Sequence, residues 1–422
     1  MNCRRISAIC GLLILYAVSA SAGSLSLSDC LRMARDNNPA LKSSAWDSRI
    51  ARENIRQSDS ALYPRLDAQA GYTMQKEPQA VIISGRTVET QEPDYLSAGL
   101  SASYTLYDFG RRSARSGQAR AVVESIDQSF EFKRSTVALQ VIEAYFGILE
   151  AGRLTLAAAE EVAQIEEHRR VAQVLFEEGV VTRNDVLQAD VRLASARQKL
   201  LSIRSQGENS WMQLNFLTGS PTAFRAELDS GAIMAIDRKP APAAALSGRH
   251  DIKALRHSLE ASEFDVRETA SNFFPELYTR LGLDYVQNDK VREQTIMSAT
   301  VGIRVNLFDG FATPAARDKA VKNRSRIQDT LRLAEEQARL EVDIAANDQS
   351  VARERIAVAE SAIRQSEENL RINQERYQER VGTATEVLDA QTLVTQTKTD
   401  YYRASYDYQT ATARLHYARG EL

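Results

Sequence analysis

Apolar residues alternate with small or polar residues along four stretches of the chain. The stretches are 66–74, 96–106, 277–285 and 297–307. A period of two predicts β-strands with one apolar and one polar face. The first pair is separated by a long loop, 75–94, and the second pair by a short one. The sequence therefore predicts two β-hairpins, at 63–107 and 276–307.

After each hairpin the apolar period becomes that of an α-helix. Long helices are predicted at 110–177 and 314–377, and shorter ones at 184–217 and 385–418. At about 1.5 Å per residue, each long helix measures roughly 100 Å. Apolar residues follow these long helices in steps of three, four and seven, which is typical of coiled coils. The two stripes are Leu139, Ile142, Phe146, Leu149, Leu156 and Ala163, and Leu333, Leu340, Ile344, Val351 and Val358.

Three shorter helices are predicted before the hairpins, at about 29–37, 40–61 and 252–272. Ser28 or Asp29 is expected to cap the first one, because their side chains accept hydrogen bonds from free helix amides. Pro39 ends that helix.

The whole pattern occurs twice. Residues 178–189 align with 379–390, six of the twelve positions are identical, and Asp185 aligns with Glu386. A fixed shift along a chain indicates an internal duplication.

The two copies are predicted at 23–219 and 246–422, with a connector rich in Pro and Ala at 220–245. The shift is 201 after the hairpins but 211 before them, where Tyr63-Pro64 matches Phe274-Pro275. The ten extra residues of the first copy therefore belong to the loop of its hairpin.

The first residues, 1–22, are predicted to be a secretory signal peptide. A basic start at Arg4 and Arg5 precedes a short apolar core and the small residues Ala20-Ser21-Ala22. Without them the chain keeps 51 of its 53 basic side chains against 56 acidic ones, a net charge of about −5. That balance gives no basic field for nucleic acid, so no nucleic-acid partner is expected.

No catalytic or metal-binding pattern is present. Cys3 and Cys10 leave with the signal peptide, so Cys30 is left without a disulfide partner. Asp29 directly before Cys30 fits a lipid-anchor site poorly, and a small half-buried cysteine is the preferred interpretation. The four histidines are scattered, and no phosphate loop or nucleophile elbow occurs. We therefore expect no catalytic residue, no metal and no cofactor.

The strands are long enough to cross a bilayer at a tilt, with the polar face toward a wet lumen and the apolar face toward lipid. The alternative is a soluble sheet packed on helices, but the helices carry only narrow apolar stripes. Four strands cannot close on themselves, and open edges do not persist in lipid. Several chains must therefore associate: two would give eight strands, and three would give twelve, with room for a channel.

These features resemble the TolC-like outer-membrane efflux proteins along nearly the whole mature chain. The motifs that carry the resemblance are Leu27-Ser28-Asp29, Asn37-Asn38-Pro39-Ala40-Leu41, Tyr63-Pro64, Tyr107-Asp108-Phe109-Gly110-Arg111, Phe308-Asp309-Gly310 and the two Val-Leu-x-Ala turns. The resemblance implies an α+β membrane protein in which a homotrimer builds a long α-helical coiled-coil barrel and a transmembrane β-barrel, with four strands from each chain.

The resemblance also implies a function. Such a protein is the exit duct of a tripartite efflux pump or a type I secretion system in the outer membrane of a Gram-negative-type cell, with its helices in the periplasm. Its partners are a periplasmic adaptor protein, an inner-membrane transporter and outer-membrane lipid, and it needs no cofactor. A soluble periplasmic coiled-coil adaptor or scaffold is the alternative function. The sequence does not identify the substrate, whether drug, metal or secreted protein.

The two repeated turns are the candidate functional sites. Small and apolar residues there are candidates for docking an adaptor: Gly179, Val180, Val181, Thr182, Val381, Gly382 and Thr383. Acids just beyond the turns are candidates for a periplasmic gate: Asp185, Glu386 and Asp389. Glu386 and Asp389 are three residues apart and share a helix face. They either stabilise the helix start through its dipole or, as the resemblance implies, join a ring of carboxylates at a constriction.

Overall fold

The computed structural model describes residues 24–231, 248–379 and 381–422. The predicted signal peptide and most of the connector 220–245 lie outside the described residues. The elements, in chain order, are α1 (Leu27–Asn37), α2 (Pro39–Asp59), a short 3-10 turn η1 (Ser60–Leu62), β1 (Arg65–Met74), β2 (Ala80–Ile83), β3 (Arg86–Glu89), β4 (Asp94–Tyr107), α3 (Arg111–Glu177), α4 (Arg183–Thr218), α5 (His250–Ser271), β5 (Glu276–Val286), β6 (Thr295–Arg304), α6 (Ala312–Gln378) and α7 (Ala384–Arg419).

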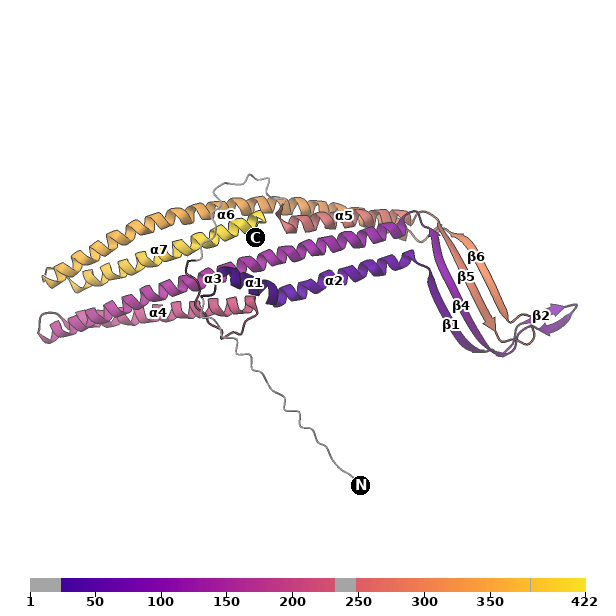
Figure 1. Cartoon of the computed structure of the whole chain (residues 1–422), viewed down its shortest axis with the longest axis horizontal. Coiled ribbons are helices and arrows are strands. Elements are labelled where there is room, and N and C mark those ends of the chain that lie inside the picture. The colour runs from indigo at the N-terminus through magenta and orange to yellow at the C-terminus, as the bar shows by residue number, and fades with distance from the viewer. Residues whose placement is uncertain (1–23, 232–247, 380) are drawn as a thin grey trace, which may run out of the picture.

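The molecule is elongated, with the strands at one end and the tips of two helical hairpins at the other (Figure 1). The long helix α3 runs beside four shorter helices, α2 and α5 nearer the sheet and α4 and α7 nearer the tips. The long helix α6 runs beside α5 and then α7. Among the described residues, no helix combines the length and the apolarity needed to cross a membrane.

The predicted helix ends agree with the structure to within two residues for α3, α4, α6 and α7. The agreement has a local cause at the ends of α4 and α7. Gly219 and Gly420 adopt left-handed backbone conformations there, with φ of 68° and 73°. A residue without a Cβ takes that conformation readily and so ends a helix.

Three expectations about local structure were wrong. Ser26, rather than Ser28 or Asp29, caps α1: its hydroxyl accepts a hydrogen bond from the Asp29 amide at 3.2 Å, and the Asp29 carboxylate closes the capping box by accepting one from the Ser26 amide at 3.4 Å. The loop 75–94 contains the small hairpin β2–β3. The last strand of the second hairpin ends at Arg304, earlier than the alternation had suggested.

The four long strands form one antiparallel sheet in the order β1-β4-β5-β6. Arg65 pairs with Ser103, and Ser103 pairs with Arg280, so the polar residues of neighbouring strands lie in register. Residues directly opposite each other in an antiparallel sheet point to the same face. The sheet therefore has one polar and one apolar face, and large apolar residues such as Leu66 and Val301 are exposed in the single chain.

An aspartate that caps a helix start lies between each hairpin and the long helix that follows it. Asp108 accepts a hydrogen bond from the backbone amide of Arg112 at 3.0 Å, and Asp309 accepts one from the backbone amide of Thr313 at 2.9 Å. Each aspartate thereby satisfies a helix amide that has no partner within the helix. The motifs Asp108-Phe109-Gly110 and Asp309-Gly310 thus mark the starts of the long helices, next to the sheet.

The largest buried cluster lies where α1, α3 and α4 meet. Tyr145 and Phe146 are fully buried there, and the Tyr145 hydroxyl donates to the backbone oxygens of Leu25 and Asp229, at 3.1 and 2.9 Å. Cys30 is also fully buried, more than expected, and burial raises the pKa of its thiol to about 12. An uncharged buried thiol is a packing residue rather than a nucleophile.

The duplication is visible in the contacts between helix starts and helix ends. The Asn38 side chain donates to the Leu217 carbonyl at 2.8 Å, and the Arg249 side chain donates to the Ala418 carbonyl at 3.2 Å. The two pairs are related by the shifts that the sequence indicates, 211 upstream of the hairpins and 201 downstream. The two copies therefore share tertiary contacts although the residue types differ.

The two predicted coiled-coil stripes behave differently. Ile142 and Phe146 of the first stripe are buried within the chain. All five residues of the second stripe are 39–70% exposed in the single chain. The buried face of α6 is instead a strict heptad of small residues, which are Ala338, Ala345, Ala352, Ala359 and Ser366. Small side chains let the backbones of α6 and its neighbours approach closely and leave the larger stripe without a partner in the single chain.

Candidate functional site at the helical tips

The two repeated turns lie together at the end of the molecule opposite the sheet (Figure 1). In the turn between α3 and α4, Gly179 has a positive φ of 72°, Val180 is exposed, and Val181 is half-buried. In the turn between α6 and α7, Val381 is 69% exposed. Each tip thus presents an exposed valine to its surroundings.

The turns differ at their glycines. A Cβ on Gly382 would meet the Arg376 Cβ at 3.1 Å and a Glu386 carboxylate oxygen at 3.2 Å, whereas a Cβ on Gly179 would meet nothing within 4 Å. Gly179 is required by its backbone conformation. Gly382 is required by close packing instead, so a large residue there would disturb the turn itself.

Asp185 and Glu386 are cap residues of the second helix at each tip. The Asp185 carboxylate accepts hydrogen bonds from the backbone amide and the hydroxyl of Thr182, at 2.9 and 2.7 Å. The Glu386 carboxylate accepts from the backbone amide of Thr383 at 3.0 Å, and the Glu386 amide donates to the Thr383 hydroxyl at 3.3 Å. Both are capping boxes, in which side chain and backbone satisfy each other's free groups.

Asp389 has a different role in the chain, because it connects the two tips. Its carboxylate accepts a hydrogen bond from the Arg192 guanidinium at 2.9 Å, from α4 to α7, and both side chains are exposed. Beside this pair, the Thr385 hydroxyl donates to the Gln188 side chain at 3.1 Å. The pattern analysis had not singled out Arg192 or Gln188. Arg192 is 197 residues from Asp389, and no motif in the sequence would have suggested this pair.

Glu386 and Asp389 nevertheless share the exposed side of α7, as expected from their spacing. Val387, Leu388 and Ala390 between and beside them are buried. Arg376 approaches Glu386 at 3.8 Å. The structure therefore brings two of the three acids onto one surface and places Asp185 on another helix.

Near the tips, an aromatic contact joins α3 to the last turn of α6. The rings of His168 and Tyr377 lie 5.7 Å apart between centroids. The His168 Nε2 and the Tyr377 hydroxyl are both buried, and neither has a hydrogen-bond partner among the described residues. Burial lowers the pKa of His168, and nearby Asp185 opposes that shift.

Within the described parts of the chain, no group of three or more His, Cys, Asp or Glu residues is arranged to hold a metal ion. The arrangement at the tips is one of exposed apolar turns, capped helices and a polar link. It suits contact with another helical protein and control of an opening, and it contains no nucleophile with an activating base.

Comparison with known proteins agrees with this architecture. The family described as "Outer membrane efflux protein" matches residues 30–220 and 241–421, one segment for each copy. The alkaline protease secretion protein AprF of Pseudomonas aeruginosa is 24% identical over 97% of this chain and 87% of its own length. The outer membrane protein TolC of Vibrio cholerae is 24% identical over 96% of this chain and 94% of its own length.

Solved structures share the fold. The outer membrane protein VceC of Vibrio cholerae superposes with a TM-score of 0.81 at 19% identity, over 93% of this chain and 96% of that one. The CmeC outer membrane channel of Campylobacter jejuni superposes with a TM-score of 0.84 at 18% identity, over 94% of this chain and 85% of that one.

A duplicated chain with paired helical hairpins on a two-faced sheet defines a channel protein of the outer membrane. The extent of the match fixes the particular group: this chain belongs to the outer membrane efflux protein family. The expectation of a TolC-like channel is thus confirmed, and the relatives are not soluble adaptors.

Proposed function

We propose that this protein is the exit duct of a tripartite efflux pump or a type I secretion system. A homotrimer receives substrate from a periplasmic adaptor and an inner-membrane transporter, and it releases the substrate outside the cell. It acts by conduction and catalyses no reaction. AprF, a full-length relative named for protease secretion, supports the secretion role, and relatives named for efflux support the other.

The observation that carries the proposal is that the single chain leaves two sheet edges and two apolar surfaces without packing partners. β1 and β6 are open edges of a sheet with an exposed apolar face, and the stripe on α6 has no partner. Further copies of the chain satisfy both at once, since strand edges pair with strand edges and apolar stripes pack into coiled coils. Three copies give twelve strands and a passage between them.

We also propose that the acids at the tips form a gate at the periplasmic entrance of the duct. Around a threefold axis, Glu386 and Asp389 of three chains form a ring of six carboxylates that attracts cations. The Arg192–Asp389 pair holds α7 against α4 and keeps that entrance narrow.

Conductance of purified trimers in planar bilayers tests this gate. A trivalent cation on the helical side should block the wild type at low salt, because salt screens such attraction. Glu386→Gln with Asp389→Asn should lose most of the block. Arg192→Gln is the matched control, because it breaks the polar link and keeps both acids: conductance should rise and block should persist. Equal block in the wild type and the double variant would exclude these acids from the gate.

The exposed valines of the two turns are proposed as adaptor contacts. Val180→Glu with Val381→Glu should abolish export while trimers still form. Docking would remove the new carboxylates from water at an apolar contact, and burying an unpaired charge costs free energy. Val381 is a better probe than Gly382, whose substitution disturbs the turn. Ile82→Glu, an exposed apolar residue at the opposite end of the molecule, is the control. Export by the double variant at the wild-type rate would contradict docking at the turns.

A further inference from the structure

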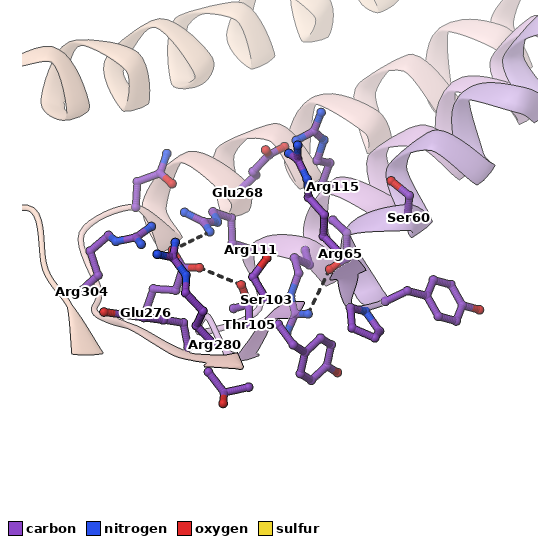
Figure 2. A pocket seen from close by; sticks show the side chains of 18 residues that line it. Ser60, Arg65, Ser103, Thr105, Arg111, Arg115, Glu268, Glu276, Arg280 and Arg304 are labelled. Atoms are coloured by element: carbon purple, nitrogen blue, oxygen red, sulfur yellow. Dashed lines mark hydrogen bonds and ion pairs between the residues drawn. The ribbon is translucent and has the colours of Figure 1, made fainter. Parts of the chain in front are cut away.

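A cavity of about 870 Å³ lies where the sheet meets η1, α3 and α5 (Figure 2). Six arginines from distant parts of the sequence line it, and they are Arg65, Arg111, Arg112, Arg115, Arg280 and Arg304. Only two carboxylates line it, those of Glu268 and Glu276. The cavity is therefore strongly basic in a chain whose net charge is negative.

Part of this positive charge is neutralised within the chain. Arg112 pairs with the buried Asp108 at 2.9 Å, Arg111 pairs with Glu276 at 3.1 Å, and Arg65 pairs with the exposed Asp67 at 2.9 Å. Those contacts hold three guanidinium groups in place, and two of the pairs are partly shielded from water. These pairs do not neutralise the other three arginines, which are Arg115, Arg280 and Arg304.

The remaining guanidinium groups are open to the cavity. Arg280 and Arg304 are exposed, and among the described residues neither forms an ion pair at 4 Å or less. Arg304 lies opposite Glu276 and attracts its carboxylate from a longer distance, but that carboxylate already pairs with Arg111. Arg304 lies over the Tyr278 ring at 4.9 Å, a contact that orients a guanidinium and leaves its charge intact. Arg115 reaches toward Glu268, whose carboxyl pKa is raised by burial (Figure 2). The arginine side chains of the cavity are thus held in place before any ligand binds, and together they keep a surplus of positive charge.

The strand register places this surplus on the polar face of the sheet. Arg65, Ser103 and Arg280 form one row across β1, β4 and β5, and Glu276 lies opposite Arg304. The apolar face, with Leu66 and Val301, is on the other side of the same strands. The arginines therefore face the passage rather than lipid if the chain forms the proposed duct, and the inference rests on that function.

We propose that this cavity binds multivalent oxyanions, carrying phosphate or carboxylate groups, as they pass from the helical part of the duct into the strands. A planar guanidinium donates two parallel hydrogen bonds to such groups, and these charge-assisted bonds are stronger than neutral ones. Three chains bring three such cavities to one level of the passage. Oxyanions that have entered the passage are held at that level.

Calorimetric titration of the detergent-solubilised trimer with tripolyphosphate tests the site directly. Saturable binding is expected for the wild type, and Arg280→Gln with Arg304→Gln should weaken it about tenfold, the effect of losing one charge-assisted hydrogen bond or more. Both side chains are exposed, so the variant should fold. Arg292→Gln, a fully exposed arginine of the β5–β6 loop, is the matched control and should bind as the wild type does.

Binding by calorimetry does not depend on conduction, so failure of the site and failure of the proposed duct are distinguishable. No binding by the wild type, or equal binding by the double variant, overturns the proposal. A second arm uses nanodiscs. If phosphatidylglycerol abolishes the tripolyphosphate binding measured in phosphatidylcholine, the site holds a lipid headgroup, and the proposal of a dissolved anion is overturned. Equal binding in both lipids supports a dissolved anion.

Discussion

His168 gives a prediction about pH at the residue scale. Its ring is buried against Tyr377 on another helix, and burial lowers the pKa of the imidazole. The packed state therefore prefers the neutral ring, while an opened state takes up a proton near the usual pKa of about 6.5. The contact between α3 and α6 is fully stable above that pH and loses stability as the pH falls below it.

Amide hydrogen exchange around His168 should report this loss. After correction for the chemical exchange rate, residues 165–172 of the wild type should exchange faster at pH 5.5 than at pH 7.5. His168→Phe keeps a ring in the contact and removes the titrating group, so its exchange should not change over that range. The same pH dependence in both proteins would show that another group is responsible.

Gly382 allows a second prediction at this scale. Gly382→Ala should loosen the α6–α7 turn because the new Cβ would press on Arg376 and on the carboxylate of Glu386. Gly179→Ala should strain the other turn through its φ instead, at a cost of about 1 kcal/mol. Thermal unfolding of the trimer measures both, and unchanged stability in the two variants would contradict the assigned glycine roles.

The tip acids show how far sequence reasoning reaches for single residues. Thr-x-x-Asp and Thr-x-x-Glu are capping boxes by sequence alone, so the places of Asp185 and Glu386 could have been derived from the motif. The partner of Asp389 could not, because Arg192 is distant in sequence and belongs to the other copy. The arginine cavity was equally hidden, since its six side chains come from four separate elements.

At the scale of elements, local signals determined most of the fold. The alternation of apolar and polar residues predicted the long strands, and proline and glycine residues predicted most helix ends. Loop 75–94 was the exception, because β2 and β3 are short and their pairing carries little pattern. The apolar stripe on α6 was predicted from its steps, but its exposure in the single chain was not. Periodicity identifies which face is apolar, and it does not say whether the same chain covers that face.

The exposed stripe yields a prediction about assembly. Leu340→Glu with Val358→Glu should prevent trimer formation, because two carboxylates would be buried between chains without partners. Glu354→Gln, also on the exposed side of α6, is the control and should assemble. Mass measurement of the detergent-extracted protein distinguishes the two states. Trimers formed by the double glutamate variant would show that the stripe faces solvent.

At the scale of the whole molecule, the orientation of the duct can be tested at its two ends. A protease site inserted at Ser84-Gly85, in the turn of the β2–β3 hairpin, should be cut on intact cells. The same site inserted at Gly179-Val180 should be cut only after the outer membrane is opened. Cleavage in the reverse order would invert the topology.

The ten extra residues of the first copy have a consequence for the outside of the assembly. The β2–β3 hairpin projects beyond the sheet (Figure 1), and its base is fastened to the short loop of the second copy: Asn288 donates to the Thr90 carbonyl at 2.8 Å, and Lys290 pairs with Glu89 at 2.6 Å. Around a threefold axis, three projecting β2–β3 hairpins alternate with three short β5–β6 loops. We therefore expect an uneven outer rim, on which the three hairpins project past the short loops of the second copies.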